Sequence, residues 1–474
     1  MRKTKIVATI GPSSQDEDTL KRMIDAGLNV VRLNTSHGSI EYHRNMIHLF
    51  KKIRKEKRVP LAILVDLEGP KMRTGDLKTE YVELKEGQEL ILTNEDILGD
   101  DKIIPLHYKN LPYEVSKGDK ILMSDGLIEL EVIESKDGRI TTVVKNGGKI
   151  THRRGLNVPG IDIQLPPLTD KDKKFLNLAL EEKVDYVAQS FVRKVSDVRL
   201  TKKIMEEYGY YIPIISKIET MQAMSQIEDI IEESDGIMVA RGDLGVELPP
   251  EDVPIAQKKI INICNRKAKP VITATQMLES MINNPRPTRA ETSDVANAIL
   301  DGTDAIMLSG ETTIGKYPVR VIEMMNRIAI YTESHFKELC NRNSKHFSYE
   351  FDTKSEAIGK AVSDIVKSMD IKTIVATTNS GSTARMIAKF RPDVTIIGAT
   401  PKFSTYNELS LVWGVYPTII PNTLTTDEMI NITTGEMLYK GVCKPGENVL
   451  ITAGIPWGVE GTTNMLMIHT LKID

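Results

Sequence analysis

Short apolar runs recur through most of the first two-thirds of the chain, and most of them show no alternation of apolar and polar positions. Such runs are typical of strands buried on both faces, as in parallel sheets. We predict eight strands: residues 5–10, 29–33, 61–67, 186–191, 212–218, 236–240, 270–274 and 304–308. Helical patterns lie between most of them, such as residues 16–24, which begin with acidic side chains. Repeated strand–helix units predict an α/β protein with a parallel sheet, and eight units favour a closed (β/α)8 TIM barrel.

The pattern changes between residues 67 and 186, where short strand candidates are separated by glycines. The candidates are residues 81–84, 89–92, 120–123, 128–133 and 139–144, and the glycines are Gly87, Gly99, Gly118, Gly126 and Gly138. This predicts a small all-β insertion after the third barrel strand, with a proline-rich return at Pro159, Pro166 and Pro167. An insertion at the carboxyl end of a barrel strand is well placed to act as a lid.

A polar stretch at residues 341–346 leads to a further α/β series. Its strand candidates are residues 374–377, 394–397, 416–420, 449–453 and 466–471. We therefore predict a barrel made of residues 1–73 and 169–343, an inserted domain at residues 74–168, and a C-terminal α/β domain at residues 344–474.

The composition excludes several classes of protein. The 474 residues are 41% hydrophobic and 27% charged, which is ordinary for a globular chain. A net charge of -3 gives no overall basic field for nucleic acid or anionic lipid. No apolar run approaches the ~20 residues of a membrane helix, and the first residues do not read as a signal peptide. Three separated cysteines without a CxxC pair argue against a disulfide scaffold or a zinc cluster, and favour a reducing compartment.

Candidate chemistry gathers at the carboxyl ends of the predicted barrel strands, the face that holds the active site in such barrels. Glu219 ends the fifth strand and Asp243 follows the sixth. If the two carboxylates converge, they form a site for a hard cation such as Mg²⁺ or Mn²⁺, with substrate oxygens and water as further ligands. The alternative is that each carboxylate pairs with an arginine or caps a helix, and the pattern alone leaves both interpretations open.

Three cationic side chains are also predicted at the carboxyl ends of the barrel strands. Lys217 alternates with Glu219, so both side chains point to the same side of their strand. A lysine beside a metal site can stabilise a developing oxyanion or a transferring phosphoryl group. Arg32 and Arg73 could grip a phosphate with their planar guanidinium groups. The alternative for each of the three is an ordinary ion pair.

Small polar groups complete the candidate site. Gly242 and Asp243 are predicted to open a helix or tight turn, where free N–H groups could bind a carboxylate or phosphate. Thr275 and Ser309 could hold water or relay a proton, although by themselves these two residues indicate very little.

Together these segments resemble pyruvate kinase, over essentially the whole chain. The motifs that carry the resemblance are KIVATIGP at 5–12, NTSHG at 34–38, ISKIE at 215–219, MVARGDLG at 238–245, ATQMLESM at 274–281 and PTRAE at 287–291. Any one of them is only suggestive, but in this order they are highly specific. The resemblance implies a (β/α)8 barrel, a β-barrel lid domain after strand three, and a C-terminal α/β regulatory domain. It also implies transfer of a phosphoryl group from phosphoenolpyruvate to ADP to form pyruvate and ATP, in a cytoplasmic homotetramer.

The resemblance also implies roles for individual residues. Glu219 and Asp243 resemble the ligands of the divalent ion, Mg²⁺ or Mn²⁺. Lys217 resembles the residue that stabilises the transferring phosphoryl group and the enolate. Arg32 and Arg73 resemble phosphate contacts. The backbone amides of Gly242 and Asp243 should receive the substrate carboxylate, with the Thr275 hydroxyl nearby. The resemblance further implies that Thr275 and Ser309 order the water that protonates enolpyruvate, and that Arg73 and Arg154 contact the nucleotide, Arg154 in place of a lysine.

One position departs from the common pattern of the family. Many members carry Asp-Thr-Lys-Gly-Pro-Glu-Ile-Arg after strand three and need K⁺, whereas residues 66–73 read DLEGPKMR, with Lys71 in place of the glutamate. Members with lysine there resemble the K⁺-independent subgroup, in which a tethered ammonium could supply the charge of K⁺. Asn34, Ser36 and Asp66 match the K⁺ ligands and would remain. The alternative is that Lys71 points to solvent and K⁺ still binds.

The C-terminal domain carries a candidate effector site. Thr378, Asn379, Ser380, Gly381, Ser382 and Thr383 precede a helix that we predict to begin near Ala384. Hydroxyls and free N–H groups at a helix start favour phosphate binding. The same stretch resembles the effector loop of relatives activated by sugar phosphates, and residues 454–464 could close over the ligand. We therefore expect a phosphorylated allosteric effector, either a sugar phosphate or AMP; the alternative is a plain helix cap. The resemblance also leads us to expect no further C-terminal domain of the kind found in some bacterial members.

Two other functions compete with this interpretation. A metal-dependent barrel aldolase or lyase acting on pyruvate would share the carboxylates, but it would not need Arg32, Arg73 and Lys217 around a phosphate. A non-catalytic barrel scaffold should have lost a charge at the site, whereas Lys217, Glu219, Asp243 and Arg32 are all present.

Overall fold

The computed structural model describes residues 1–336, 353–422, 425–455 and 463–472. Eight parallel strands close into a barrel in the order β1-β16-β15-β14-β13-β12-β3-β2, as predicted. Their bounds are β1 (Lys5–Thr9), β2 (Val30–Asn34), β3 (Ala62–Asp66), β12 (Tyr186–Gln189), β13 (Ile214–Ile218), β14 (Gly236–Ala240), β15 (Val271–Ala274) and β16 (Ala305–Leu308). The missing alternation in the sequence has a simple cause, because both faces of these strands are buried.

Successive residues of each barrel strand enter different cores. Val7 packs with residues such as Leu64 inside the barrel, whereas Ile6 and Ala8 join the core between the strands and the surrounding helices. The larger surrounding helices are α1 (Glu17–Asp25), α2 (Ile40–Lys57), α4 (Asp170–Glu181), α5 (Val195–Tyr208), α7 (Ile227–Glu233), α9 (Asp252–Arg266), α10 (Arg289–Leu300) and α12 (Pro318–Ser334). Short helical turns lie near the carboxyl ends of several strands: α6 (Met221–Ser225), α8 (Arg241–Glu247), η1 (Glu279–Ile282) and α11 (Gly310–Thr313). Helix α1 begins as predicted, because the Asp16 side chain accepts a hydrogen bond from the backbone N–H of Thr19.

The segment between β3 and α4 forms a separate β domain with its own core. Six strands follow the order β11 (Leu156–Asn157), β7 (Lys120–Met123), β8 (Ile128–Lys136), β9 (Arg139–Asn146), β5 (Glu89–Thr93) and β6 (Ile103–Pro105). A two-stranded sheet pairs β4 (Tyr81–Leu84) with β10 (Gly148–Thr151), and α3 (Leu111–Glu114) packs beside β8. The five predicted strands are present; the additional β6, β10 and β11 are only two to four residues long and carry too little pattern to be recognised.

The C-terminal domain is a five-stranded sheet in the order β19-β18-β17-β20-β21, in which only β21 is antiparallel. Its elements are α14 (Lys354–Ser368), β17 (Thr373–Thr377), α15 (Ser382–Lys389), β18 (Thr395–Thr400), α16 (Phe403–Glu408), η2 (Leu409–Leu411), β19 (Val415–Ile419), α17 (Thr426–Tyr439), β20 (Asn448–Ala453) and β21 (Met465–Thr470). Helix α15 begins at Ser382, two residues before the predicted start, because Gly381 adopts a left-handed backbone with φ of 80° and turns the chain into the helix. The polar stretch 341–346 lies outside the described residues.

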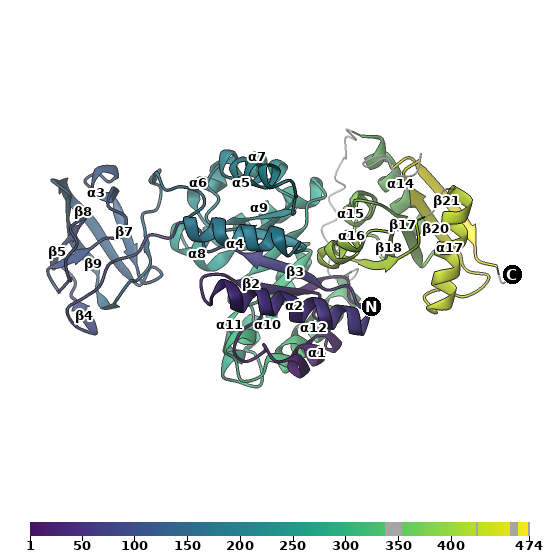
Figure 1. Cartoon of the computed structure of the whole chain (residues 1–474), viewed down its shortest axis with the longest axis horizontal. Coiled ribbons are helices and arrows are strands. Elements are labelled where there is room, and N and C mark those ends of the chain that lie inside the picture. Colours follow the sequence, from purple (N-terminus) through teal and green to yellow (C-terminus); the bar gives the residue numbers. More distant parts are fainter. Residues whose placement is uncertain (337–352, 423–424, 456–462, 473–474) are drawn as a thin grey trace.

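The inserted β domain and the C-terminal domain lie at opposite ends of the barrel (Figure 1). At the end nearer the C-terminal domain, Leu411 joins the core inside the barrel. Arg391 of the C-terminal domain reaches Asp304 before β16, at 3.1 Å, and stacks 4.8 Å from the centre of the Trp413 ring. The inserted domain follows the carboxyl end of β3, so it stands over the mouth where we predicted the chemistry.

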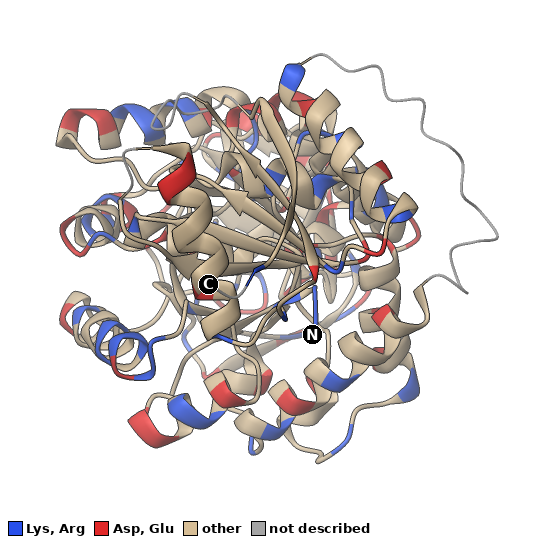
Figure 2. Ribbon diagram, turned by 90° about the vertical axis from the view of Figure 1, so that its right-hand side faces the viewer, with Lys and Arg blue, Asp and Glu red and all other residues tan. Residues whose placement is uncertain are grey.

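In the ribbon of Figure 2, charged residues occur mostly on the outer helices, and residues of both signs are interspersed. This distribution agrees with the near-neutral net charge of -3. Across the part of the chain that the structure describes, none of the helices has the length and apolar character needed to cross a bilayer.

Candidate active site

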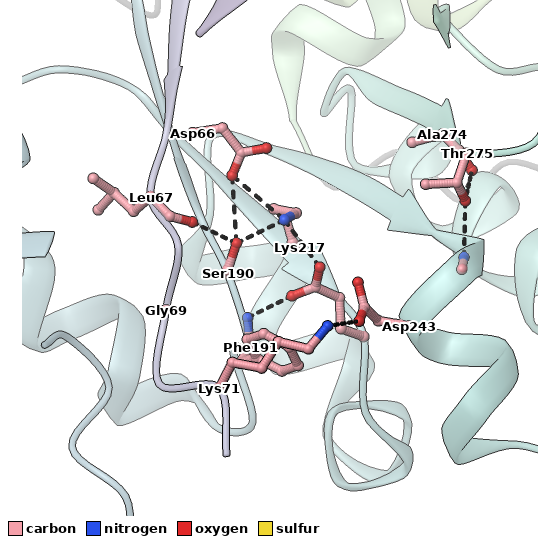
Figure 3. A network of polar contacts seen from close by, with 12 residues as sticks. Asp66, Leu67, Gly69, Lys71, Ser190, Phe191, Lys217, Asp243, Ala274 and Thr275 are labelled. Carbon is pink, nitrogen blue, oxygen red and sulfur yellow. Dashed lines mark hydrogen bonds and ion pairs between the residues drawn. The ribbon is translucent and has the colours of Figure 1, made fainter. Parts of the chain in front are cut away.

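The Lys217 ammonium is the centre of a buried polar network at the barrel mouth (Figure 3). Lys217 is the penultimate residue of β13, and its Nζ donates to Ser190 Oγ at 2.6 Å and to Glu219 Oε1 at 2.9 Å. Asp66 Oδ1 lies 3.4 Å from the same nitrogen. Burial alone would lower the pKa of Lys217, but the negative charges of Asp66 and Glu219 outweigh it and raise the pKa above its usual value. The lysine therefore remains a cation at neutral pH.

Asp66 links this lysine to Arg32. Arg32 on β2 donates through Nε to Asp66 Oδ2 at 2.6 Å and through Nη1 to Thr9 Oγ1 at 2.7 Å. The register that pairs Asn34 with Asp66 brings the ends of β2 and β3 together. Burial would raise the pKa of Asp66, yet Lys217 and Arg32 hold it below the usual range. Arg32 is thus a buried, fixed guanidinium rather than a surface ion pair.

Glu219 and Asp243 occupy neighbouring positions, as the strand order predicts. Burial raises the pKa of Glu219, and the charge of Asp243 raises it further despite the opposing effect of Lys217. Glu219 Oε2 accepts a hydrogen bond from the backbone N–H of Phe191 at 2.6 Å. The Lys71 ammonium lies 3.0 Å from Asp243 Oδ1 and 5.9 Å from the centre of the Phe191 ring. Lys71 therefore points into the mouth of the barrel and not to solvent.

Thr275 and Gly242 are in direct contact. The Gly242 N–H donates to Thr275 Oγ1 at 2.8 Å, and that hydroxyl donates to the Ala274 carbonyl at 2.6 Å. Thr275 has a φ of 69°, which is unusual for a β-branched residue and marks local strain at the end of β15. The Ser309 hydroxyl is buried and has no hydrogen-bond partner among the described residues.

Two further predicted residues, Arg73 and Arg154, are not part of the hydrogen-bond network around Lys217. Arg73 pairs with Glu68 at 3.1 Å, and the same carboxylate accepts from Lys171 at 2.7 Å. Burial would raise the pKa of Glu68, but Lys171 and Arg73 lower it. Arg154 lies in the inserted domain, where its Nε donates to Thr151 Oγ1 at 2.5 Å, and its backbone carbonyl accepts from Thr74.

The three residues that match K⁺ ligands, Asn34, Ser36 and Asp66, have different hydrogen-bond partners. Asp66 is held by Arg32 and Lys217, as described above. Asn34 Oδ1 accepts from the Ser36 N–H at 3.2 Å, and the Ser36 carbonyl accepts from the Lys171 ammonium at 3.2 Å. Lys171 thus brings a second ammonium close to these residues, and the sequence pattern did not single it out.

A cleft of about 320 Å³ separates the inserted domain from the barrel mouth. Lys71 and Phe191 line it from the barrel side, and Leu156 and Val158 line it from the inserted domain. Asn157 crosses the gap by donating to Glu247 Oε1 at 2.9 Å. The inserted domain and the barrel mouth therefore line one cleft, and Asn157 bridges its two sides.

Sequence reasoning missed Ser190 and Phe191, which contact the two central charged residues. They follow β12, the fourth barrel strand, and the same strand-end rule that located Lys217 would have pointed to them. Their importance depends on the register that sets Gln189 opposite Ser216, one residue before Lys217. Phe191 also has a φ of 52°, which turns its N–H toward Glu219.

The predicted effector residues lie together at the start of α15. The Thr383 hydroxyl contacts the Thr463 hydroxyl at 2.9 Å, and Arg385 donates to the Ser380 carbonyl at 2.9 Å. A cavity of about 550 Å³ between the barrel and the C-terminal domain is lined by Asn379, Ser380 and Ser382. Its charged lining residues are the cations Lys267, Lys269, Arg385 and Lys402 and the carboxylates Asp235 and Glu408. Thr378 is buried, and its N–H donates to the Ala399 carbonyl. Residues 456–462 of the predicted closing segment lie outside the described residues.

Fold and site together define a class: a TIM-barrel enzyme whose mouth combines buried cations with two carboxylates beneath a β domain. The family description "Pyruvate kinase, barrel domain" matches residues 1–322, and "Pyruvate kinase, alpha/beta domain" matches residues 356–469. The chain is 47% identical over 476 aligned positions to the pyruvate kinase of Thermotoga maritima, with complete coverage of both chains. It is 44% identical to that of Geobacillus stearothermophilus, covering 99% of this chain and 81% of the relative.

A solved structure agrees with these sequence comparisons. The crystal structure of a pyruvate kinase from Cryptosporidium parvum superposes with a TM-score of 0.93 at 37% identity, covering 99% of this chain and 96% of the other. The chain belongs to the pyruvate kinase family and is a phosphotransferase.

Proposed function

We propose that the barrel mouth transfers a phosphoryl group from phosphoenolpyruvate to ADP, with Lys217 as the cation that stabilises the transferring group and the enolate. The observation that carries this assignment is the buried Lys217 ammonium between Ser190, Asp66 and Glu219. A fixed cation in a site of low dielectric constant stabilises charge that develops in the transition state without reorganising. Phosphoryl transfer needs mainly such positioning and neutralisation, because its transition state is loose.

Glu219 and Asp243 fit a divalent cation such as Mg²⁺ or Mn²⁺. Both supply hard carboxylate oxygens, and the raised pKa of Glu219 reflects in part its repulsion by Asp243, which a divalent ion would relieve. No cluster of three or more metal-ligating side chains occurs within the described ranges, so substrate oxygens and water would complete the shell. A bound ion held by these two residues would supply charge neutralisation at the transferring phosphoryl group and the enolate oxygen.

The other side chains would orient the substrates. Arg32, fixed by Asp66 and Thr9, offers its remaining N–H groups to the phosphate. Gly242, Asp243 and Thr275 would receive the substrate carboxylate, which must displace the present Gly242–Thr275 hydrogen bond. Thr275 and Ser309, whose hydroxyl has no partner within the described ranges, would hold the water that protonates enolpyruvate. Arg73 and Arg154 would contact nucleotide phosphates when the inserted domain closes.

We further propose that the enzyme works without K⁺. The Lys71 ammonium stands at 3.0 Å from Asp243, so it brings a permanent positive charge into the mouth. Lys171 adds a second ammonium at the Ser36 carbonyl. With both charges present, the site formed by Asn34, Ser36 and Asp66 would no longer need a monovalent ion.

We propose regulation by a phosphorylated effector, a sugar phosphate or AMP, at residues 378–383. The lysine and arginine side chains around the neighbouring cavity support this proposal, because they offer charge-assisted hydrogen bonds to phosphate. A cytoplasmic homotetramer is the assembly that the family resemblance supports.

The experiment that tests the function is product analysis with phosphoenolpyruvate, ADP and Mg²⁺. Equal amounts of pyruvate and ATP, and no pyruvate when ADP is omitted, are the expected result. Cleavage of a longer keto acid without formation of ATP would instead support a lyase.

A further inference from the structure

Ser190 is a buried hydroxyl at the centre of the lysine network. It follows the end of β12 and is 2% exposed. Its Oγ lies 2.6 Å from Lys217 Nζ, 2.6 Å from the Leu67 carbonyl oxygen and 3.3 Å from Asp66 Oδ1. Figure 3 shows the hydroxyl between these groups. Ser190 therefore joins the ends of strands β3, β12 and β13 through a single oxygen.

The number of hydrogens on each group determines the direction of these bonds. A serine hydroxyl has one hydrogen and two lone pairs, whereas an ammonium has three hydrogens and no lone pair. The short contact with Leu67 O makes that carbonyl the acceptor of the serine hydrogen, and a serine lone pair then accepts from Lys217. The carbonyl thus orients the hydroxyl, and the hydroxyl orients the ammonium.

The other two partners of Lys217 are shared with further groups. Asp66 also accepts from Arg32 at 2.6 Å, and Glu219 also accepts from the Phe191 N–H at 2.6 Å. Both carboxylates carry charge that substrate or cation binding will redistribute. Ser190 is neutral and is hydrogen-bonded to the backbone of Leu67, directly after β3, so its contact with Lys217 does not depend on that redistribution.

We propose that Ser190 is a positioning residue for phosphoryl transfer: its hydroxyl holds the Lys217 ammonium in the orientation that the transition state requires. The proposal rests on the role of Lys217 proposed above. Without the hydroxyl, the ammonium turns toward the carboxylates, and substrate still binds but reacts slowly.

The test compares variants that each lose one buried serine hydroxyl, either at Ser190 or at a control serine. Ser190→Ala removes the acceptor, and Ser190→Cys fills nearly the same space with a weak acceptor. The control is Ser216→Ala: Ser216 precedes Lys217 on β13, but in the described structure its hydroxyl contacts the Ser234 hydroxyl, at 2.6 Å, and not Lys217. For each variant kcat, the KM for phosphoenolpyruvate, the melting temperature and the Kd of Mn²⁺ alone are measured.

Both Ser190 variants are expected to lower kcat by about tenfold or more while KM and the Mn²⁺ Kd change by less than about threefold. Ser216→Ala is expected to retain kcat within about twofold even if it melts earlier. A Ser190 variant with the kcat of the parent would overturn the proposal. So would a Ser190 variant that loses no more kcat than Ser216→Ala when the two have the same melting temperature. Lys217→Met distinguishes failure of the Ser190 proposal from failure of the proposed function of Lys217. If the Lys217→Met variant remains fully active, the proposed role of Lys217 itself is wrong.

Discussion

The Lys71 ammonium lies 3.0 Å from Asp243 Oδ1. Lys71 follows β3, and Asp243 lies on α8, the short helix directly after β14. The residue in which this sequence departs from the common pattern of its family therefore touches a carboxylate that we assign to the divalent cation. This contact is the basis of the proposal that Lys71 supplies a positive charge in place of K⁺.

Reversal of this charge should create a need for K⁺. Lys71→Glu removes the ammonium and places a carboxylate near Asp243, so the rate without K⁺ is expected to fall by about tenfold or more and to recover on addition of K⁺. Steady-state rates across a K⁺ titration measure this. Lys78→Glu, which alters a lysine paired with Asp100 in the inserted domain, is the control and should show no K⁺ response. A Lys71→Glu enzyme with unchanged rates in both buffers would contradict the prediction.

Removal of either proposed metal ligand should weaken cation binding directly. Glu219→Gln and Asp243→Asn each leave one carboxylate, so the Kd of Mn²⁺, measured by electron paramagnetic resonance without substrates, is expected to rise by about tenfold or more. Glu247→Gln is the matched control, because Glu247 lies on the same helix as Asp243 but binds Asn157. Equal Mn²⁺ affinity in all three variants would remove both residues from the site.

The close approach of Gly69 to Ser190 predicts a large effect for a single methyl group. A Cβ at Gly69 would lie 2.8 Å from the Ser190 Cβ, and the backbone φ of 75° disfavours any other residue. Gly69→Ala is expected to cost about 1–3 kcal/mol of stability and to lower kcat as well. Gly87→Ala has a similar φ of 78° with nothing within 4 Å, so it should lose stability only. Thermal melts and initial rates distinguish the two; equal kcat in both variants would contradict the prediction.

Glu408 should make the stability of the barrel–C-terminal contact depend on pH. Burial raises the pKa of Glu408 from 4.5 to about 7, with Asp185 and Asp235 adding to the shift and Arg385 and Lys402 opposing it. Below about pH 4.5 both the folded and the unfolded state hold the proton. Between pH 4.5 and 7 the unfolded state ionises first, so stability falls as pH rises and is lowest above pH 7.

Glu408→Gln removes this titration. The melting temperature of the variant should be close to that of the parent at pH 5 and higher than that of the parent at pH 8. At pH 8 the unfolding free energy of the variant should exceed that of the parent by at most about 3 kcal/mol. Scanning calorimetry at both pH values measures the difference, with Glu41→Gln on the exposed start of α2 as control. A difference that does not change between pH 5 and pH 8 would refute the assignment.

Much of the site followed from the strand pattern, for a geometrical reason. The carboxyl ends of parallel strands meet at one face, so Lys217, Glu219 and Asp243 could be brought together without knowledge of any contact. The eight strands were recognisable because burial on both faces removes polar residues from them.

Other features depend on register and on conformations that residue type does not reveal. Ser190 matters because β12 and β13 align Gln189 with Ser216, and Phe191 reaches Glu219 because its backbone is left-handed. The pairing of Arg73 and Lys171 with Glu68 depends on the path by which the chain leaves the barrel. Pattern alone does not encode these relationships.

The most direct test of the account is the rate of pyruvate formation from phosphoenolpyruvate, ADP and Mg²⁺, measured in buffer free of K⁺ and again with K⁺ added. We predict pyruvate and ATP in equal amounts, dependent on ADP, at similar rates in both buffers. Activity only in the presence of K⁺ would contradict the role of Lys71, and no ATP in either buffer would contradict the central claim that this mouth transfers a phosphoryl group.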